Sequence, residues 1–326
     1  TARKHDLGIE MGFFKDQLSF NVDLFSEKRT DMLLTPVESP LLGITSKDVN
    51  AGSMKKHGVD IEAKWRSTTA SGFYYEIGAM VGLNENRITK YDEPVNTPVY
   101  QRWEGTPYKA ARTGMNQIDG GYFSSVDALH GYPNSLGSLD NTYLGIYKLL
   151  DFDADGRITN RDMHAIEGVA YPPVVGSFNI GLGYKGFSFN MLFYGTYGKY
   201  IEFNRSFWKE FIKQDWVVHS AQLDYWTPTN PNAGHAALSF DDKTYSMLGG
   251  SSNNSYSMLI DGHSWRMSDY LSLKEVYLAY KFDGKKLQDA LGVRGLSITL
   301  TGNNLFMFSD LIEGNPQRTE LVGSYY

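Results

Sequence analysis

Apolar and polar side chains alternate with a period of two through residues 178–184 and again through residues 187–197. Only Lys185 and Gly186 separate the two runs, which is the spacing of a tight β-hairpin. The apolar side of this hairpin carries Phe178, Ile180, Leu182, Tyr184, Phe187, Phe189, Met191 and Phe193. Glycine and polar residues dominate the other side. The pattern predicts two antiparallel strands that separate lipid from a wet interior, as in a transmembrane β-barrel.

The same alternation predicts about eight such strands along the chain. Besides the hairpin, they cover residues 4–13, 17–28, 59–66, 75–83 and 270–282, and a last segment that starts near residue 296. The apolar phase changes within 270–282, which predicts a bulge near Lys274 or Glu275.

The segment 59–66 has the clearest division into two faces. Asp60, Glu62, Lys64 and Arg66 alternate with apolar residues, and four charges cannot face lipid. We therefore expect these four side chains to face the water-filled interior of the barrel.

The connections between the predicted strands alternate between short and long. Short ones follow the first, third and fifth strands, whereas long ones occupy residues 29–56, 85–176 and 198–269. Outer-membrane barrels combine short periplasmic turns with long extracellular loops in this way. Residues 284–293 have apolar positions at helical spacing, which predicts a short helix inside a periplasmic turn. The predicted fold is thus all-β: an antiparallel transmembrane barrel section with long extracellular loops.

The amino-acid composition and the absence of certain motifs argue against several classes of function. Aromatic residues make up 14% of the chain, with 22 Tyr and 18 Phe, although its mean hydropathy is only -0.37. No apolar run is long enough for a spanning helix, and the net charge of -6 argues against nucleic acid as a partner. Cysteine is absent, which excludes disulfides and thiolate sites. No nucleophile or metalloprotease motif occurs, so no catalytic residue is predicted.

An acidic segment at residues 151–162 predicts a calcium site. Asp151, Asp153, Asp155 and Asp162 stand at alternate positions and at the twelfth, and the Arg157 carbonyl falls where a backbone ligand is expected. Calcium is the expected cofactor, with a role in stiffening an outer loop. The alternative is a solvated acidic turn without metal.

The third long connection is rich in aromatic rings. Among them, Trp208, Trp216, Trp226 and Trp265 are candidates for binding a substrate or a protein partner, because flat rings stack against sugars and peptide side chains. The alternative is that these rings form a small core for the loop itself.

Several motifs, taken in order, resemble the SusC/RagA group of TonB-dependent outer-membrane transporters of Bacteroidetes. They are the segments 50–62, 151–162, 171–173, 178–193, 268–280 and 300–308. Asp60 stands where the family's passage before a strand carries Glu. The resemblance extends over essentially the whole chain.

The resemblance implies that residues 1–326 form the C-terminal part of one barrel of about 22 strands, without the plug domain and the final strand. It implies an outer-membrane location in a Gram-negative bacterium and uptake of glycans or peptides. It also implies two partners, a SusD-like surface lipoprotein and the TonB complex, which acts through the absent N-terminal region. The competing interpretation is a calcium-stabilised surface protein or adhesin of β architecture that binds carbohydrate. An enzyme would need a nucleophile and a base that the sequence does not offer.

Overall fold

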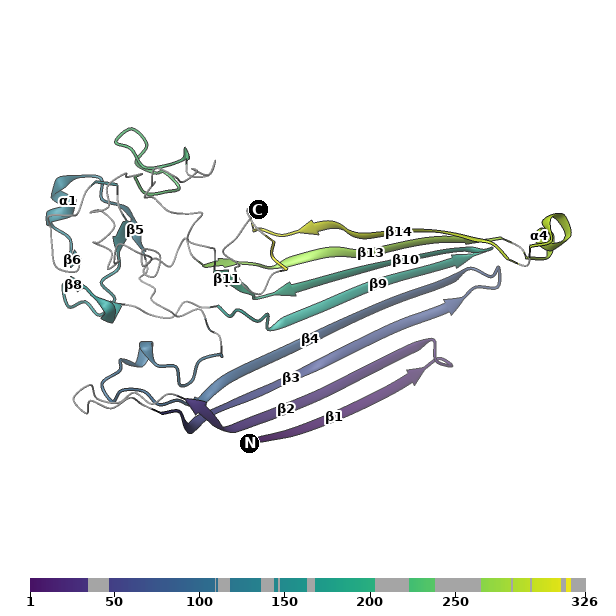
Figure 1. The fold of residues 1–326 in the computed structure, drawn as a ribbon, viewed down its shortest axis with the longest axis horizontal. Coiled ribbons are helices and arrows are strands. Elements are labelled where there is room, and N and C mark those ends of the chain that lie inside the picture. Colours follow the sequence, from purple (N-terminus) through teal and green to yellow (C-terminus); the bar gives the residue numbers. More distant parts are fainter. Residues whose placement is uncertain are drawn as a thin grey trace.

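The computed structural model shows one large antiparallel sheet with most of its loops gathered at one end (Figure 1). It describes residues 1–34, 47–108, 110, 118–135, 144–145, 147–162, 168–202, 223–237, 265–282, 284–293, 295–311 and 315–317. Within these residues no helix has the length and apolar character needed to cross a membrane.

In the described part of the chain, the main sheet contains eight strands, paired in the order β1-β2-β3-β4-β9-β10-β13-β14. They are β1 (Ala2–Phe13), β2 (Leu18–Leu34), β3 (Val49–Thr68), β4 (Tyr74–Lys90), β9 (Val174–Tyr184), β10 (Phe187–Tyr197), β13 (Tyr270–Lys281) and β14 (Ser297–Phe308). Every neighbouring pair is antiparallel. β1 and β14 are the two ends of this order and do not pair with each other, so the sheet is an open wall.

The cross-strand register divides the wall into an apolar and a polar face. Directly paired positions run from Leu18 through Trp65, Ile77 and Ile180 to Met191, all on the apolar face. The positions between them on each strand are mostly glycine, charged or amide residues. Because residues directly opposite one another lie on the same face, the period of two in the sequence becomes a continuous apolar surface. We call these two surfaces the apolar face and the polar face.

The turns at one end of the wall are short. Lys185 and Gly186 connect β9 to β10 with φ of 45° and 88°, the pair of positive values that a type I′ hairpin turn requires. Residues 14–17 connect β1 to β2, and residues 69–73 connect β3 to β4. The helix α4 (Gly284–Leu291) lies between β13 and β14 at this end, as the sequence predicts (Figure 1).

The predicted bulge is also present. In β13 the register with β14 shifts between Leu273 and Glu275, and the register with β10 shifts opposite the same place. Against β10, Lys274 is the extra residue, whereas against β14 the extra residue lies on β14. The amino group of Lys274 donates a hydrogen bond to Asn304 Oδ1 at 3.1 Å.

The first long connection is shorter than predicted, because the flanking strands continue. β2 runs to Leu34 and β3 begins at Val49, although residues 29–56 were expected to be a loop. Both faces of these extensions carry polar residues, so the alternation that reveals a strand between lipid and water is lost. Strand pairing continues without it, and β4 likewise extends to Lys90.

Small elements occupy the long connections. They are the strands β5 (Ile118–Tyr122), β6 (Asn134–Ser135), β7 (Tyr147–Leu149), β8 (Arg157–Ile158), β11 (Tyr200–Glu202) and β12 (Trp265–Met267), the helix α1 (Val126–His130), and the 3-10 helices η2 (Val99–Gln101) and η4 (Asn160–Asp162). Several of the most buried apolar side chains belong to this region, including Leu149, Ile158 and Ile201. The long connections therefore have small cores of their own.

Candidate functional site

The polar face of the wall includes the four charged residues of β3 that the sequence assigns to the interior. Asp60, Glu62, Lys64 and Arg66 share one face and alternate with Ile61, Ala63 and Trp65 on the other. Lys64 Nζ lies 3.0 Å from Glu76 Oε1 on β4. Asn21 Nδ2 on β2 donates to Glu62 Oε2 at 3.4 Å, and Arg66 Nε donates to the carbonyl of Asp16 at 3.3 Å.

Glycines on the polar face make room for neighbouring polar side chains. A Cβ atom added to Gly82 would lie 2.6 Å from Asp60 Oδ1, and one added to Gly78 would lie 2.2 Å from Asn179 Oδ1. The same holds for Gly181, where a Cβ would lie 2.9 Å from Asn190 Oδ1. The absence of a side chain at these three glycines therefore relieves crowding on the polar face.

Acidic residues gather in a hollow of the polar face. The hollow has a volume of about 470 Å³ and is lined by residues of β1 to β4 and β9, including Glu10, Asp23, Asp60, Glu62 and Lys56. Asp23 and Asp60 are directly paired across β2 and β3. Since like charges directly opposite one another are destabilising, this surface favours a cationic group or ordered water.

Aromatic rings line the apolar face along the end with the short turns. Phe14 contacts Trp65 with ring centroids 5.9 Å apart, and Phe187 contacts Tyr280 at 4.3 Å. Phe73 bridges to the β9–β10 hairpin, with 6.2 Å between its centroid and that of Tyr184. Such a belt marks the interface between lipid and water in transmembrane barrels. We call this row the aromatic belt.

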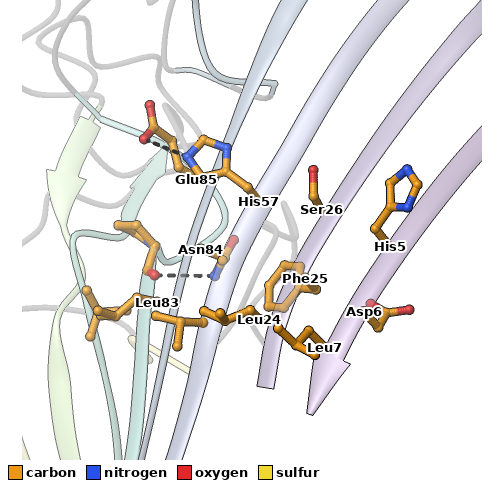
Figure 2. Close-up of a pocket in the computed structure, with 14 residues that line it drawn as sticks. His5, Asp6, Leu7, Leu24, Phe25, Ser26, His57, Leu83, Asn84 and Glu85 are labelled. Carbon is orange, nitrogen blue, oxygen red and sulfur yellow. Dashed lines mark hydrogen bonds and ion pairs between the residues drawn. The ribbon is translucent and has the colours of Figure 1, made fainter. Parts of the chain in front are cut away.

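A groove of about 790 Å³ lies farther along β1 to β4, toward the long-loop end. Its lining includes Leu7, Leu24 and Leu83, and the next positions on the same face are polar (Figure 2). His57 Nε2 lies 3.6 Å from Glu85 Oε2 at this polar margin. The groove therefore lies at the border between the apolar part of this face and its polar extension.

The structure brings together three of the predicted calcium ligands. Carboxylate oxygens of Asp151, Asp153 and Asp155 lie within 4.8 Å of one another. Backbone N–H groups hold two of these carboxylates in place: Gly156 N donates to Asp151 Oδ2 at 2.9 Å, and Arg157 N donates to Asp155 Oδ1 at 2.8 Å. Gly156 has φ of 82°, the left-handed conformation that favours glycine.

Asp162 has a different role from its neighbours. Its side chain is fully buried, and its two oxygens accept hydrogen bonds from the backbone N–H groups of Phe152 at 2.8 Å and Thr159 at 2.6 Å. It therefore closes the acidic segment as an internal clamp, and it is not part of the group formed by the other three carboxylates.

The acidic segment is attached to the first half of the long β4–β9 connection. Tyr100 in η2 donates a hydrogen bond to the carbonyl of Arg161 at 2.7 Å and packs its ring 4.8 Å from that of Phe152. Burial, and next the negative charge of Asp153, raise the pKa of the Tyr100 hydroxyl. Arg161 Nε lies 3.5 Å from Asp153 Oδ2, which offsets part of that charge.

The structure describes the four tryptophans that were predicted to bind a ligand to different extents. Trp208 and Trp216 lie outside the described residues, and of Trp265 only the backbone pairing with Glu202 is described. Trp226 is 5% exposed and covers Gly145, where a Cβ would lie 2.3 Å from Trp226 Cε3. This position matches the alternative interpretation, in which a ring forms part of a loop core.

Lys199 is a buried cation that the sequence does not reveal. It is 2% exposed, and its Nζ donates to the carbonyl of Pro316 at 2.9 Å. Ser268 Oγ donates to the same carbonyl at 3.0 Å, and the backbone N–H of Lys199 donates to Asp269 Oδ1. Burial lowers the pKa of the Lys199 ammonium group. The contacts join the two ends of the β10–β13 connection to the segment that follows β14.

An antiparallel wall with one apolar and one polar face, an aromatic belt and unequal connections is the architecture of an outer-membrane β-barrel. No family model matches the chain. Solved structures agree with the architecture: the RagAB peptide transporter has a TM-score of 0.65 at 21% identity over 97% of this chain. The RagAB peptide importer in its closed-closed state has a TM-score of 0.66 at 20% identity.

Relatives in sequence point to the same class. TonB-dependent receptor P26 of Formosa agariphila is 24% identical over 95% of the chain, and TonB-dependent receptor P3 of the same organism is 21% identical over 97%. The chain spans 30% of the length of each receptor and 32% of the RagAB transporter chain. It is thus similar to one part of a SusC/RagA-type TonB-dependent transporter, which confirms the resemblance and the outer-membrane location inferred from the sequence. These relatives are named as receptors or transporters, in agreement with the prediction that the chain is not an enzyme.

Proposed function

We propose that this chain forms part of the barrel wall of an importer that takes up nutrients across the outer membrane. The observation that carries the proposal is the cross-strand register. It places apolar residues on one face of eight neighbouring strands of the sheet and charged or amide residues on the other face. Leu300 is 69% exposed and Phe306 is 64% exposed on this face, as expected for side chains that contact lipid. A soluble carbohydrate-binding protein would cover such residues.

The polar face is the proposed wall of the transport path. Asp60, Glu62, Lys64 and Arg66 then face the interior, where they contact a plug, the substrate or water. The acidic hollow next to them favours cationic groups. We propose a glycan or a peptide as the cargo, and the RagAB structures, which are named as a peptide transporter and importer, favour a peptide. The proposed energy source is the TonB complex, and the proposed partner on the outer face is a SusD-like lipoprotein.

The acidic segment is the proposed calcium site of an outer loop. Its support is the convergence of Asp151, Asp153 and Asp155, whose mutual repulsion a divalent cation would relieve. The Arg157 carbonyl remains a candidate ligand, whereas the hydrogen bonds of Asp162 favour a structural role. Calcium would stiffen the connection that Tyr100 and Phe152 already link, and no chemical step is assigned to it.

A growth experiment with the intact protein tests the proposed transport. A strain that lacks the gene, the same strain with the gene restored, and the wild type are grown on oligopeptides or on oligosaccharides as the limiting nutrient. We expect the deletion to impair growth on one of the two classes only, with free amino acids and monosaccharides as matched controls. Normal growth of the deletion strain on both classes, or recovery of the protein outside the outer membrane, would contradict the proposal.

A further inference from the structure

Basic side chains continue the apolar face beyond the groove. Arg3, Lys28, Lys55 and Arg87 are directly paired across β1, β2, β3 and β4. All four are exposed, and they lie on the same face as the leucines of the groove, two same-face positions farther from the short turns. The pattern is a row of four cations on adjacent strands of one face. We call it the basic row.

The position of the basic row corresponds to one membrane thickness. Lys55 lies ten residues from Trp65 of the aromatic belt along the same strand. At a rise of about 3.3 Å per residue and a tilt of about 40°, ten residues cover roughly 25 Å along the membrane normal. This is about the height of the apolar band of a transmembrane barrel. If Trp65 lies at the periplasmic interface, Lys55 therefore lies at the headgroups of the outer leaflet.

Although the strands are tilted, the other cations of the basic row lie close to the height of Lys55 in the membrane. Neighbouring strands about 4.8 Å apart and tilted by about 40° differ in height by roughly 3 Å per strand. Lys and Arg side chains extend over several ångströms and keep their charged ends in the polar layer. Cations on adjacent strands can thus reach the same layer.

The charges in the basic row are only partly compensated. Arg87 is paired with Glu85 and also donates to the carbonyl of Gly105 at 3.0 Å. Within the described residues no ion pair is found for Arg3, Lys28 or Lys55. Because like charges directly opposite one another destabilise a sheet, three cations in a row favour an anionic ligand.

The groove supplies the second half of the binding surface. Its leucines lie on the lipid side of the basic row. His5, Ser26, His57 and Glu85 are the next positions on this face (Figure 2), and the register places them between the leucines and the basic row. An amphiphile bound here would place an acyl chain against the leucines and its phosphate against the cations. On β1, β2 and β3 the order of apolar, polar and cationic side chains matches that of a phosphorylated lipid from chain to headgroup, whereas on β4 Glu85 of the middle row is paired with Arg87.

We propose that Arg3, Lys28 and Lys55 form a binding site for the phosphate groups of a phosphorylated lipid in the outer leaflet, with its acyl chain in the groove. This inference rests on the proposed function only in that the apolar face must contact the membrane. It concerns the outside of the wall, whereas transport uses the polar face.

The test compares two triple variants of the intact protein purified from outer membranes in a non-ionic detergent. R3Q/K28Q/K55Q removes three cations from the basic row. K4Q/R29Q/K56Q removes three cations at the same level of the same strands from the polar face, and is the matched control. Native mass spectrometry and phosphorus analysis measure the lipid that stays bound.

We expect the wild type and the polar-face control to retain phosphorylated lipid. Each Lys or Arg beside an anionic surface strengthens binding by about fivefold, so the basic-row variant should bind on the order of a hundredfold more weakly. Binding of the wild type should weaken as salt is raised. Nanodiscs with phosphorylated or dephosphorylated lipid separate the lipid from free phosphate: inorganic phosphate at millimolar concentration should not displace the lipid.

Equal lipid retention by the two triple variants would overturn the inference, as would displacement by inorganic phosphate alone. A slower-migrating unfolded band before heating would mark a variant that fails to fold, and single variants K28Q and K55Q then provide the comparison. Loss of the wild-type protein from the outer membrane would instead contradict the proposed function, so the two failures are distinguishable.

Discussion

A charge on the apolar face should be costly in proportion to its depth, and Ile180 is the position that tests this best. It lies four residues from Tyr184 of the aromatic belt, on a strand whose direct neighbours at this level are Ile77 and Met191. Four residues at a tilt of about 40° correspond to roughly 10 Å, which is close to the midplane of a band about 25 Å tall. Ile180→Arg should therefore destabilise the folded wall by about 2 to 4 kcal/mol.

Two comparison variants make the magnitude diagnostic. Phe189 lies on the same face but only two residues from Phe187 of the belt, so Phe189→Arg should cost about 0 to 1 kcal/mol for its charge. Asn179 precedes Ile180 and lies on the polar face, where its amide donates to Glu76 Oε1 at 3.4 Å. Asn179→Arg places the same side chain at nearly the same depth next to a carboxylate. It should have little effect.

The assay is the folded fraction in outer membranes, read from the faster migration of unheated barrel protein, combined with urea titration of the purified protein. A cost of 2 to 4 kcal/mol changes the folding equilibrium by about 30-fold to 1000-fold, at about 1.4 kcal/mol per factor of ten. Equal stability of Ile180→Arg and Asn179→Arg would refute the assignment of the faces. A larger effect of Phe189→Arg than of Ile180→Arg would refute the assignment of depth.

Further predictions concern the loops and the close contacts of the strands. Replacing Asp153 and Asp155 by Ala should abolish calcium binding measured by titration calorimetry, while heat-dependent migration shows an intact barrel; retained binding would locate the site elsewhere. Hydrogen bonds from Asn230 and the backbone of Gly234 lower the pKa of Asp224. The ionised Asp224 should therefore stabilise the loop fully above about pH 4, and this stabilisation should be lost as the pH falls through the lowered pKa. Hydrogen exchange of the loop measured against pH should detect the loss. Gly58→Ala should destabilise the wall by about 1 to 3 kcal/mol, because the added Cβ would lie 2.4 Å from the carbonyl oxygen of Leu83, and unchanged urea stability would contradict this packing. Protease added to intact cells should cut within residues 198–269 unless a partner covers them; cleavage only after permeabilisation would invert the topology.

The fold was predictable where strands lie between lipid and water. There every second residue meets a different solvent, so β9 and β10 are visible as a strict alternation of Phe178, Ile180 and Leu182 with polar residues. The bulge at Lys274 was visible for the same reason, since it interrupts that phase. Where strands leave the membrane both faces meet water, and the alternation that would reveal the ends of β2, β3 and β4 disappears.

The candidate sites were predictable only in part, because they depend on contacts between distant segments. The spacing of Asp151, Asp153 and Asp155 is local, so their convergence could be inferred from the sequence. The burial of Lys199 could not, because Ser268 lies at the opposite end of the β10–β13 connection and Pro316 follows β14. The basic row has a weak signal in the sequence: Lys28 and Lys55 continue the phase of the apolar positions, and only the register shows that they are direct neighbours.

The two open edges of the wall indicate how many strands the proposed barrel must have at least. Backbone N–H and C=O groups in the hydrocarbon region must be hydrogen-bonded, so a strand edge cannot face lipid unpaired. Among the residues that the structure describes, β1 and β14 each pair with one strand only, and they do not pair with each other. An eight-stranded barrel would require that pairing. A membrane location therefore requires further strands on both sides of this wall, which supports the prediction that the eight strands belong to a larger barrel. The chain's match to 30% of the length of its curated relatives agrees with this argument.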